Sequence, residues 1–180
     1  MRDSRQNSTN LFFKKDKRMN YSDITKLLQT GKYDTLLLDR DGVINVLRPN
    51  DYVKSWEEFI FIPSFLEAIP QWSQLVSRIV IVTNQRGVAK GLFTEEALND
   101  IHQRMVEEIQ QTGGRIDRIY YCTALSKDDP NRKPQPGLFK QLQKEFPETD
   151  PQRCLMIGDM PSDMEFAQNC GIEGILISED

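Results

Sequence analysis

An apolar run that ends abruptly in paired acids is the feature that most constrains how this chain can fold. The segment 35–38 has the length and composition of a buried strand, and Asp39 and Asp41 follow it directly, with Gly42 permitting a sharp turn. In an open α/β sheet the carboxyl ends of the strands line the ligand crevice, so both carboxylates would face a substrate from a rigid platform. The competing interpretation is a solvated turn, because an acid followed by glycine is common in turns.

The same alternation of apolar runs and helical patterns continues to the end of the chain. Further apolar runs predict strands at 78–82, 116–122, 154–157 and 174–178. Segments with helical spacing predict helices at 23–30 (capped by Ser22), 64–75 (kinked or interrupted by Pro70), 94–112 (capped by Thr94), 138–146 and 162–170 (capped by Ser162). This order predicts an α/β fold of Rossmann-like type, with a parallel sheet flanked by helices on both faces.

The totals favour a single soluble domain. A chain of 180 residues can bury one core, while the first twenty residues carry a net charge of +4 and the remainder −8. We therefore expect a basic N-terminal appendage at 1–20 and one domain at 21–180, and the aromatic-rich segment 45–62 to cross the mouth of the site. The acidic body argues against nucleic-acid binding. No apolar run is long enough for a membrane span or a signal peptide, which favours a cytoplasmic protein, and three unpaired cysteines predict no disulfide.

Polar side chains follow several of these strands where each one ends. Taken singly they are ordinary: Thr83 suits a cap, Lys133 a solvated surface, and Asp163 the first turn of a helix. Together with Asp39 and Asp159 they would converge on one sheet edge. Three carboxylates there would repel one another unless a divalent cation lay among them, and oxygen ligands suit Mg²⁺. A lysine, a threonine hydroxyl and the amides of a glycine turn are groups that bind phosphate.

Four motifs in this order resemble those of the haloacid dehalogenase-like phosphatases. They are Asp39-Arg40-Asp41-Gly42, Thr83-Asn84-Gln85, Arg132-Lys133-Pro134 and Gly158-Asp159-x-x-x-Asp163. The resemblance runs from about residue 36 to 178 and is strongest to the branch without a large cap domain, which includes heptose 1,7-bisphosphate and histidinol-phosphate phosphatases. It implies a magnesium-dependent enzyme, expected to be a monomer, that hydrolyses a small phosphate ester, with a heptose bisphosphate as the expected substrate and histidinol phosphate or another metabolite as the alternative.

The resemblance also implies a role for each matching residue. Asp39 would attack phosphorus and become an aspartyl phosphate, while Asp41 would protonate the leaving oxygen and then activate water. Two sets of ligands follow. The metal ligands would be Asp39, Asp41 through its backbone carbonyl, Asp159 and, directly or through water, Asp163. The phosphate-binding residues would be Thr83, Asn84, Lys133, Arg132 and Gly42.

Two other classes compete with an enzyme. A signalling receiver domain also combines an acid cluster, a threonine and a lysine on a parallel sheet, but its phosphate-accepting aspartate comes on a later strand. A catalytically silent phosphate-binding relative is disfavoured by the intact pair Asp39 and Asp41. Turnover of a generic phosphate ester with Mg²⁺ would exclude both.

The segment before the lysine motif departs from the resemblance. Many heptose bisphosphate phosphatases hold a structural zinc there through a Cys-x-His and a later Cys-x-Cys. Here Cys122 fills the first place, but Ala124, Asp129 and Asn131 fill the others. Because structural zinc needs about four nitrogen or sulfur ligands, we expect no zinc in this protein.

Overall fold

A six-stranded, wholly parallel sheet forms the centre of the computed structural model, which describes residues 17–178. The strands are β1 (Arg18–Met19), β2 (Thr35–Leu38), β3 (Arg78–Asn84), β4 (Arg118–Cys122), β5 (Cys154–Gly158) and β6 (Glu173–Ile177), in the spatial order β1-β6-β5-β2-β3-β4. The strand that carries the acid pair, β2, lies between β5 and β3. The polar segments after these three strands therefore meet at one edge.

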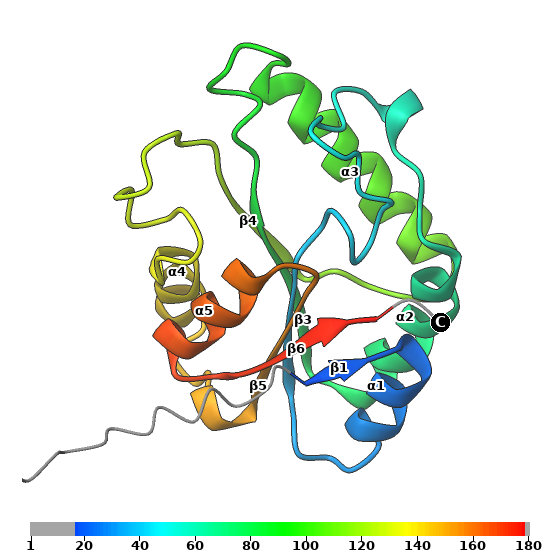
Figure 1. Cartoon of the computed structure of the whole chain (residues 1–180). Helices are drawn as coiled ribbons and strands as arrows, with labels where there is room; N and C mark the ends of the chain where they lie inside the picture. The colour runs from blue at the N-terminus through cyan, green and yellow to red at the C-terminus, as the bar shows by residue number, and fades with distance from the viewer. Residues whose placement is uncertain (1–16, 179–180) are drawn as a thin grey trace, which may run out of the picture.

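Helices cover both faces of the sheet, as the sequence predicts (Figure 1). On one side lie α1 (Tyr21–Leu28), α2 (Pro63–Leu75) and α3 (Glu95–Gln111), and on the other lie α4 (Gly137–Glu145) and α5 (Pro161–Cys170). Alternate strand residues feed two separate hydrophobic clusters: Leu36 and Leu38 pack on the α1–α3 side, and Leu37 on the α4–α5 side. Burial on both faces explains why the central strands are continuously apolar.

The first strand, β1, was not predicted from the sequence. Arg18 and Met19 pair with Leu176 and Ile177 of β6, so the boundary expected after residue 20 is wrong, and the folded unit includes these residues. A strand of two residues shows no periodicity, which is why the pattern missed it. The rest of the expected appendage, residues 1–16, lies outside the described residues.

Three helices also differ from the prediction, two of them at their N-terminus and one in its interior. The α1 cap is Asn20, whose side chain accepts from the Asp23 N–H, rather than Ser22. The second helix continues through Pro70 without ending, because buried residues on both sides of it, Ile69 and Trp72, hold it against the core. The fifth helix begins at Pro161, a residue earlier than expected, with proline at the position where its missing N–H costs no hydrogen bond.

The segment 45–62 has little regular structure and contains the 3₁₀ turn η1 (Trp56–Glu58). Its aromatic rings pack on one another: the Phe59 ring centroid lies 5.1 Å from that of Trp56 and 4.9 Å from that of Phe61, so these rings serve local packing. An isolated bridge joins Asn45 to Phe61 and closes the segment at its base. Among the described residues, no helix combines the length and apolarity that crossing a membrane requires.

Candidate active site

A cavity of about 1050 Å³ opens at the carboxyl ends of β2, β3 and β5. Seven of the nine residues that the sequence marked as site residues lie in its wall: Asp39, Asp41, Asn84, Arg132, Lys133, Asp159 and Asp163. The convergence predicted from separate strand ends is therefore present. Its cause is the strand order, which places β2 between β3 and β5.

A buried ion-pair network forms the floor of this cavity. The Lys133 Nζ donates to Asp39 Oδ1 at 3.0 Å and to Asp163 Oδ1 at 2.7 Å, although these residues are 94 and 30 positions away in sequence. The Lys133 side chain is only 3% exposed, so its charge is compensated by carboxylates rather than by water. Burial alone would lower the pKa of Lys133, but Asp39 and Asp163 outweigh it and raise that pKa, which keeps the lysine charged.

Three carboxylates lie close enough together to share one cation. Oxygen atoms of Asp39, Asp159 and Asp163 lie within 4.8 Å of one another. Burial, followed by the charge of Asp163, raises the pKa of Asp159 to about 6, and burial with the neighbouring acids raises the pKa of Asp39 despite the opposing effect of Lys133. The buried Asp159 Oδ1 has no hydrogen-bond partner among residues 17–178. A clustered set of hard oxygen donors with an unsatisfied buried oxygen fits a divalent cation such as Mg²⁺.

The N-terminus of α5 positions the deepest of these acids. Asp163 Oδ2 accepts from the backbone N–H groups of Asp159 and Met160, both at 3.2 Å, while its other oxygen faces Lys133. Gly158 permits this arrangement, because a Cβ there would lie 2.3 Å from the Cβ of Asp163. The sequence predicted that Ser162 caps this helix, but the carboxylate of Asp163 takes that role.

Asp41 is held apart from the acid cluster by donors of its own. Its Oδ1 accepts from Arg40 Nη2 and Asn45 Nδ2, and its Oδ2 accepts from Gln85 Nε2, each at 2.9 Å. Burial alone would raise the pKa of Asp41, but the charge of Arg40 and these hydrogen bonds outweigh it and lower that pKa. The two aspartates of the motif therefore have different environments: Asp39 lies among other carboxylates, whereas Asp41 is surrounded by hydrogen-bond donors.

Three of the residues predicted to bind phosphate have hydrogen-bond partners within the protein. The N–H of Gly42 is already donated to the Asn45 carbonyl at 2.8 Å, and this glycine is needed instead because a Cβ would lie 2.1 Å from Asp159 Oδ2 and because φ is +84°. The Thr83 hydroxyl is fully buried and accepts from Gln85 at 3.0 Å, so it lies behind the cavity wall. Asn84 lines the cavity, but its amide is occupied.

Both ends of the Asn84 amide bind the backbone of the lysine motif. Its Nδ2 donates to the Lys133 carbonyl and its Oδ1 accepts from the Lys133 N–H, both at 3.0 Å. Asn84 thus fixes the segment that carries the buried lysine. Arg132 lies in the cavity wall as predicted, and its guanidinium donates to the carbonyl of Leu125. Sequence reasoning missed Arg40, Asn45 and Gln85, for which the only signal was their position inside or beside the two motifs.

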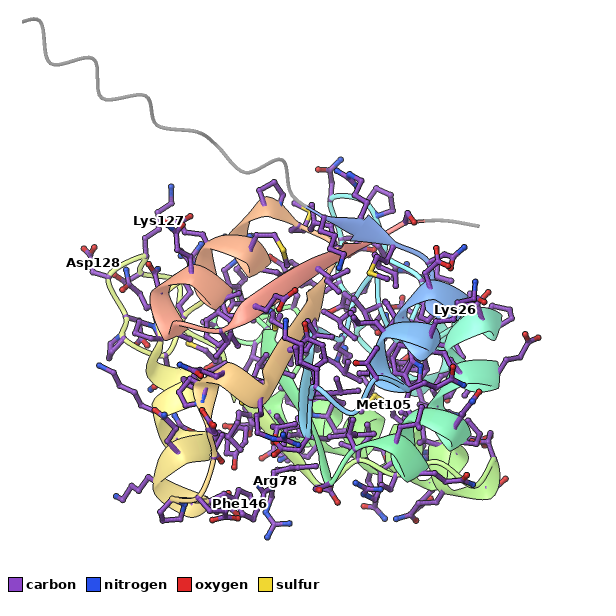
Figure 2. All side chains as sticks on the ribbon, turned by 90° about the horizontal axis from the view of Figure 1, so that it is seen from below. Lys26, Arg78, Met105, Lys127, Asp128 and Phe146 are labelled. Carbon is purple, nitrogen blue, oxygen red and sulfur yellow. The ribbon has the colours of Figure 1, made fainter. Side chains whose placement is uncertain are left out.

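The mouth of the cavity carries cationic side chains from three different segments. These are Arg48, Arg86, Lys90, Lys127 and Arg132, against the acids Asp51, Asp128 and Glu165. Arg48 is paired with Asp51 and Glu58, and the Lys90 Nζ lies 5.2 Å from the Tyr52 ring centroid. Figure 2 shows Lys127 and Asp128 on the loop after β4, pointing away from the sheet. An anionic group some distance from the floor would meet positive charge here.

Hydrogen bonds order the loop that follows β4. The Cys122 Sγ lies 3.7 Å from Asp129 Oδ1, which also accepts from the Asn131 N–H at 2.9 Å. Burial raises the pKa of the Cys122 thiol, so it remains protonated. The three described cysteines form no disulfide. That the protein carries no zinc stays a prediction.

Comparisons with known proteins agree with this geometry. A HAD-hydrolase-like family model matches residues 130–180. D-glycero-beta-D-manno-heptose-1,7-bisphosphate 7-phosphatase of Pseudomonas aeruginosa is 36% identical over 143 residues, 79% of each chain, and the alpha-specific enzyme of Mycobacterium bovis is 36% identical over 78% of this chain and 75% of its own. The D,D-heptose 1,7-bisphosphate phosphatase of B. bronchiseptica, solved with magnesium and phosphate, superposes with a TM-score of 0.74 at 34% identity, covering 79% of each chain.

Proposed function

Because this chain belongs to the haloacid dehalogenase-like phosphatases, we propose that it is a magnesium-dependent phosphomonoesterase that acts on a heptose 1,7-bisphosphate through an aspartyl-phosphate intermediate. The observation that carries the proposal is the separation of Asp39 from Asp41. The Asp39 side chain belongs to the carboxylate cluster and contacts the buried Lys133. The Asp41 side chain does neither and is bound by Arg40 instead. This is the division of labour that a nucleophile and a proton-transfer group require.

The reaction follows from these positions in two displacements. A carboxylate oxygen of Asp39 forms a bond to phosphorus as the bond from phosphorus to the sugar oxygen breaks, and Asp41 donates its proton to that oxygen. A water molecule then attacks the aspartyl phosphate, and Asp41 takes its proton, so that Asp39 is regenerated and inorganic phosphate leaves. Asp41 is ionised before substrate binds; the negative charge of an incoming phosphoryl group beside it would raise its pKa and let it carry the proton.

Asp39, Asp159 and Asp163 would hold the Mg²⁺ ion, with the backbone carbonyl of Asp41 as a further ligand. The ion would supply positive charge that keeps the carboxylate of Asp39 ionised and offsets the charge of the phosphoryl oxygens. Lys133 would supply a second positive charge beside Asp39. The pairing of Asn84 with the Lys133 backbone keeps this lysine at its place when the cavity fills.

A second phosphate on the substrate accounts for the cations at the cavity mouth. Arg86 and Lys127 lie in the wall of a cavity large enough for a phosphorylated sugar, and neither is required for the chemistry at its floor. Charge-assisted contacts from such side chains would retain a bisphosphate better than a monophosphate. The relatives named above include enzymes for both anomers, so the proposal extends to the heptose and not to its anomeric form.

The test is a comparison of substrates with the purified protein. Initial rates would be measured for heptose 1,7-bisphosphate, histidinol phosphate and p-nitrophenyl phosphate, each with Mg²⁺ and with excess chelator. We expect the highest kcat/KM for the bisphosphate and no turnover with chelator. If p-nitrophenyl phosphate is hydrolysed but histidinol phosphate has a higher kcat/KM than heptose 1,7-bisphosphate, the phosphatase activity is supported and the proposed substrate is refuted. No turnover of any ester would refute the activity itself.

A further inference from the structure

The arginine between the two motif aspartates is completely buried, which is unusual for this residue type. Its guanidinium is held on two sides. Nη2 donates to Asp41 Oδ1 at 2.9 Å, and Nη1 lies 3.2 Å from Nε2 of His102 on α3, 62 residues away in sequence. The Phe59 ring centroid lies 5.9 Å from Arg40 Cζ, and Arg40 Nε has no hydrogen-bond partner among the described residues. The contacts with Asp41 and His102 are therefore the directional ones that orient the guanidinium.

The hydrogen bond between Arg40 and His102 can have only one direction. A guanidinium has donors and no acceptor, so Nε2 of His102 must accept the hydrogen bond and carry no proton. His102 is buried at 5% exposure, with the Tyr121 ring 5.8 Å away. Burial, followed by the charge of Arg40, lowers the pKa of His102 to about 3, so the ring is neutral at any pH at which the protein would work.

The donors around Asp41 distinguish its two oxygens. Oδ1 receives two hydrogen bonds, from Arg40 and Asn45, whereas Oδ2 receives one, from Gln85. Oδ2 is therefore the oxygen with room to bind and release a proton. If Arg40 turned away, Oδ1 would lose a charged donor, and the proton could settle on the wrong oxygen.

We infer that His102 is a positioning residue for catalysis: its neutral imidazole fixes the guanidinium of Arg40, which in turn holds Asp41 with Oδ2 directed to the leaving group. The inference rests on the proposed acid–base function of Asp41. No reacting atom touches His102, and its influence passes through Arg40 alone. A histidine in the middle of α3 thereby controls the geometry of a carboxylate two contacts away.

Substrates with different leaving groups separate this role from packing. An alkyl phosphate such as a sugar phosphate needs a proton on its leaving oxygen, whereas p-nitrophenolate leaves without one. We expect His102→Phe, which keeps an aromatic ring but removes the acceptor, to lower kcat for the sugar phosphate about 10- to 100-fold with KM changed less than about 2-fold. The pre-steady-state burst of p-nitrophenolate should change by less than about 3-fold, because it reports only attack by Asp39.

A conservative variant and a matched control complete the experiment. His102→Gln, whose side-chain oxygen can accept from Arg40, should restore kcat for the sugar phosphate to within about 3-fold of the wild type. Ile109→Ala, two turns along the same helix and equally buried, should lower stability but leave both rates unchanged. If His102→Phe does not fold, His102→Leu takes its place.

The inference would be overturned if the substitution lowered the burst and the sugar-phosphate rate equally, if it changed neither, or if His102→Gln failed to restore activity. Asp41→Asn serves as the reference background. There, His102→Phe should cost less than about 2-fold, because the group that it positions is already disabled. If Asp41→Asn alone keeps full activity, the proposed function of Asp41 fails rather than the role of His102.

Discussion

Mg²⁺ affinity should weaken sharply as the pH falls below 6, and this prediction tests the acid cluster without reference to catalysis. The cause lies in the metal-free protein, where burial and the charge of Asp163 raise the pKa of Asp159 to about 6. A carboxylate must be ionised to bind the ion, so a proton on Asp159 competes with it. Because the pKa is raised, competition is absent well above it and grows as the pH falls through it.

The magnitude follows from that one pKa. At about pH 7 nearly all of the Asp159 carboxylate is ionised, while at about pH 5 only about a tenth is, so the apparent Kd for Mg²⁺ should rise about 10-fold between the two. Burial and neighbouring acids also raise the pKa of Asp39, which adds to this effect. The two carboxylates therefore act in the same direction, and about 10-fold is the change expected from Asp159 alone.

Isothermal titration calorimetry measures both the affinity and the protons released. Titrations near pH 6 in two buffers of different ionisation enthalpy should show release of about half a proton or more per Mg²⁺ bound. Asp128→Asn, which removes an exposed acid at the cavity mouth, should keep the same pH dependence and serves as the control for general surface charge. An affinity that is equal at both pH values, with no proton release, would refute the reasoning.

Four substitutions test the remaining assignments. Asp39→Asn should abolish steady-state release of phosphate, since an amide is a poor nucleophile. A rate reduced by less than about 10²-fold from the wild type would show that Asp39 is not the nucleophile. Asp41→Asn should lower kcat about 10²- to 10⁴-fold while the calorimetric Kd for Mg²⁺ changes less than about 2-fold. Gly42→Ala should weaken Mg²⁺ binding at least about 10-fold, because its Cβ would displace Asp159, and should cost about 1 kcal/mol in denaturant unfolding for the positive φ. Cys122→Ser should leave kcat unchanged, and elemental analysis of the untagged protein should find no zinc; one tightly bound zinc per chain would contradict this.

The order of motifs along the chain was sufficient to predict the architecture and the floor of the site. Apolar runs that alternate with helical patterns admit few arrangements other than a parallel sheet with helices on both faces. Since the strands of such a sheet end at one edge, Asp39, Lys133, Asp159 and Asp163 could be placed together before any distance was known. These predictions succeed because strand direction and side-chain chemistry are local properties of the sequence.

The roles of individual polar groups depended on contacts that no local pattern contains. Gly42 was predicted to offer its N–H to phosphate, but that group is bound to Asn45, and its missing side chain makes room for Asp159. The Asn84 side chain binds the backbone of Lys133, a contact that the sequence did not predict. The contact between Arg40 and His102 spans 62 residues, and only the packing of α3 on the sheet creates it. Hydrogen-bond partners and burial, and through them the pKa values of buried acids, arise from tertiary structure, because each depends on groups that the fold brings together from distant parts of the chain.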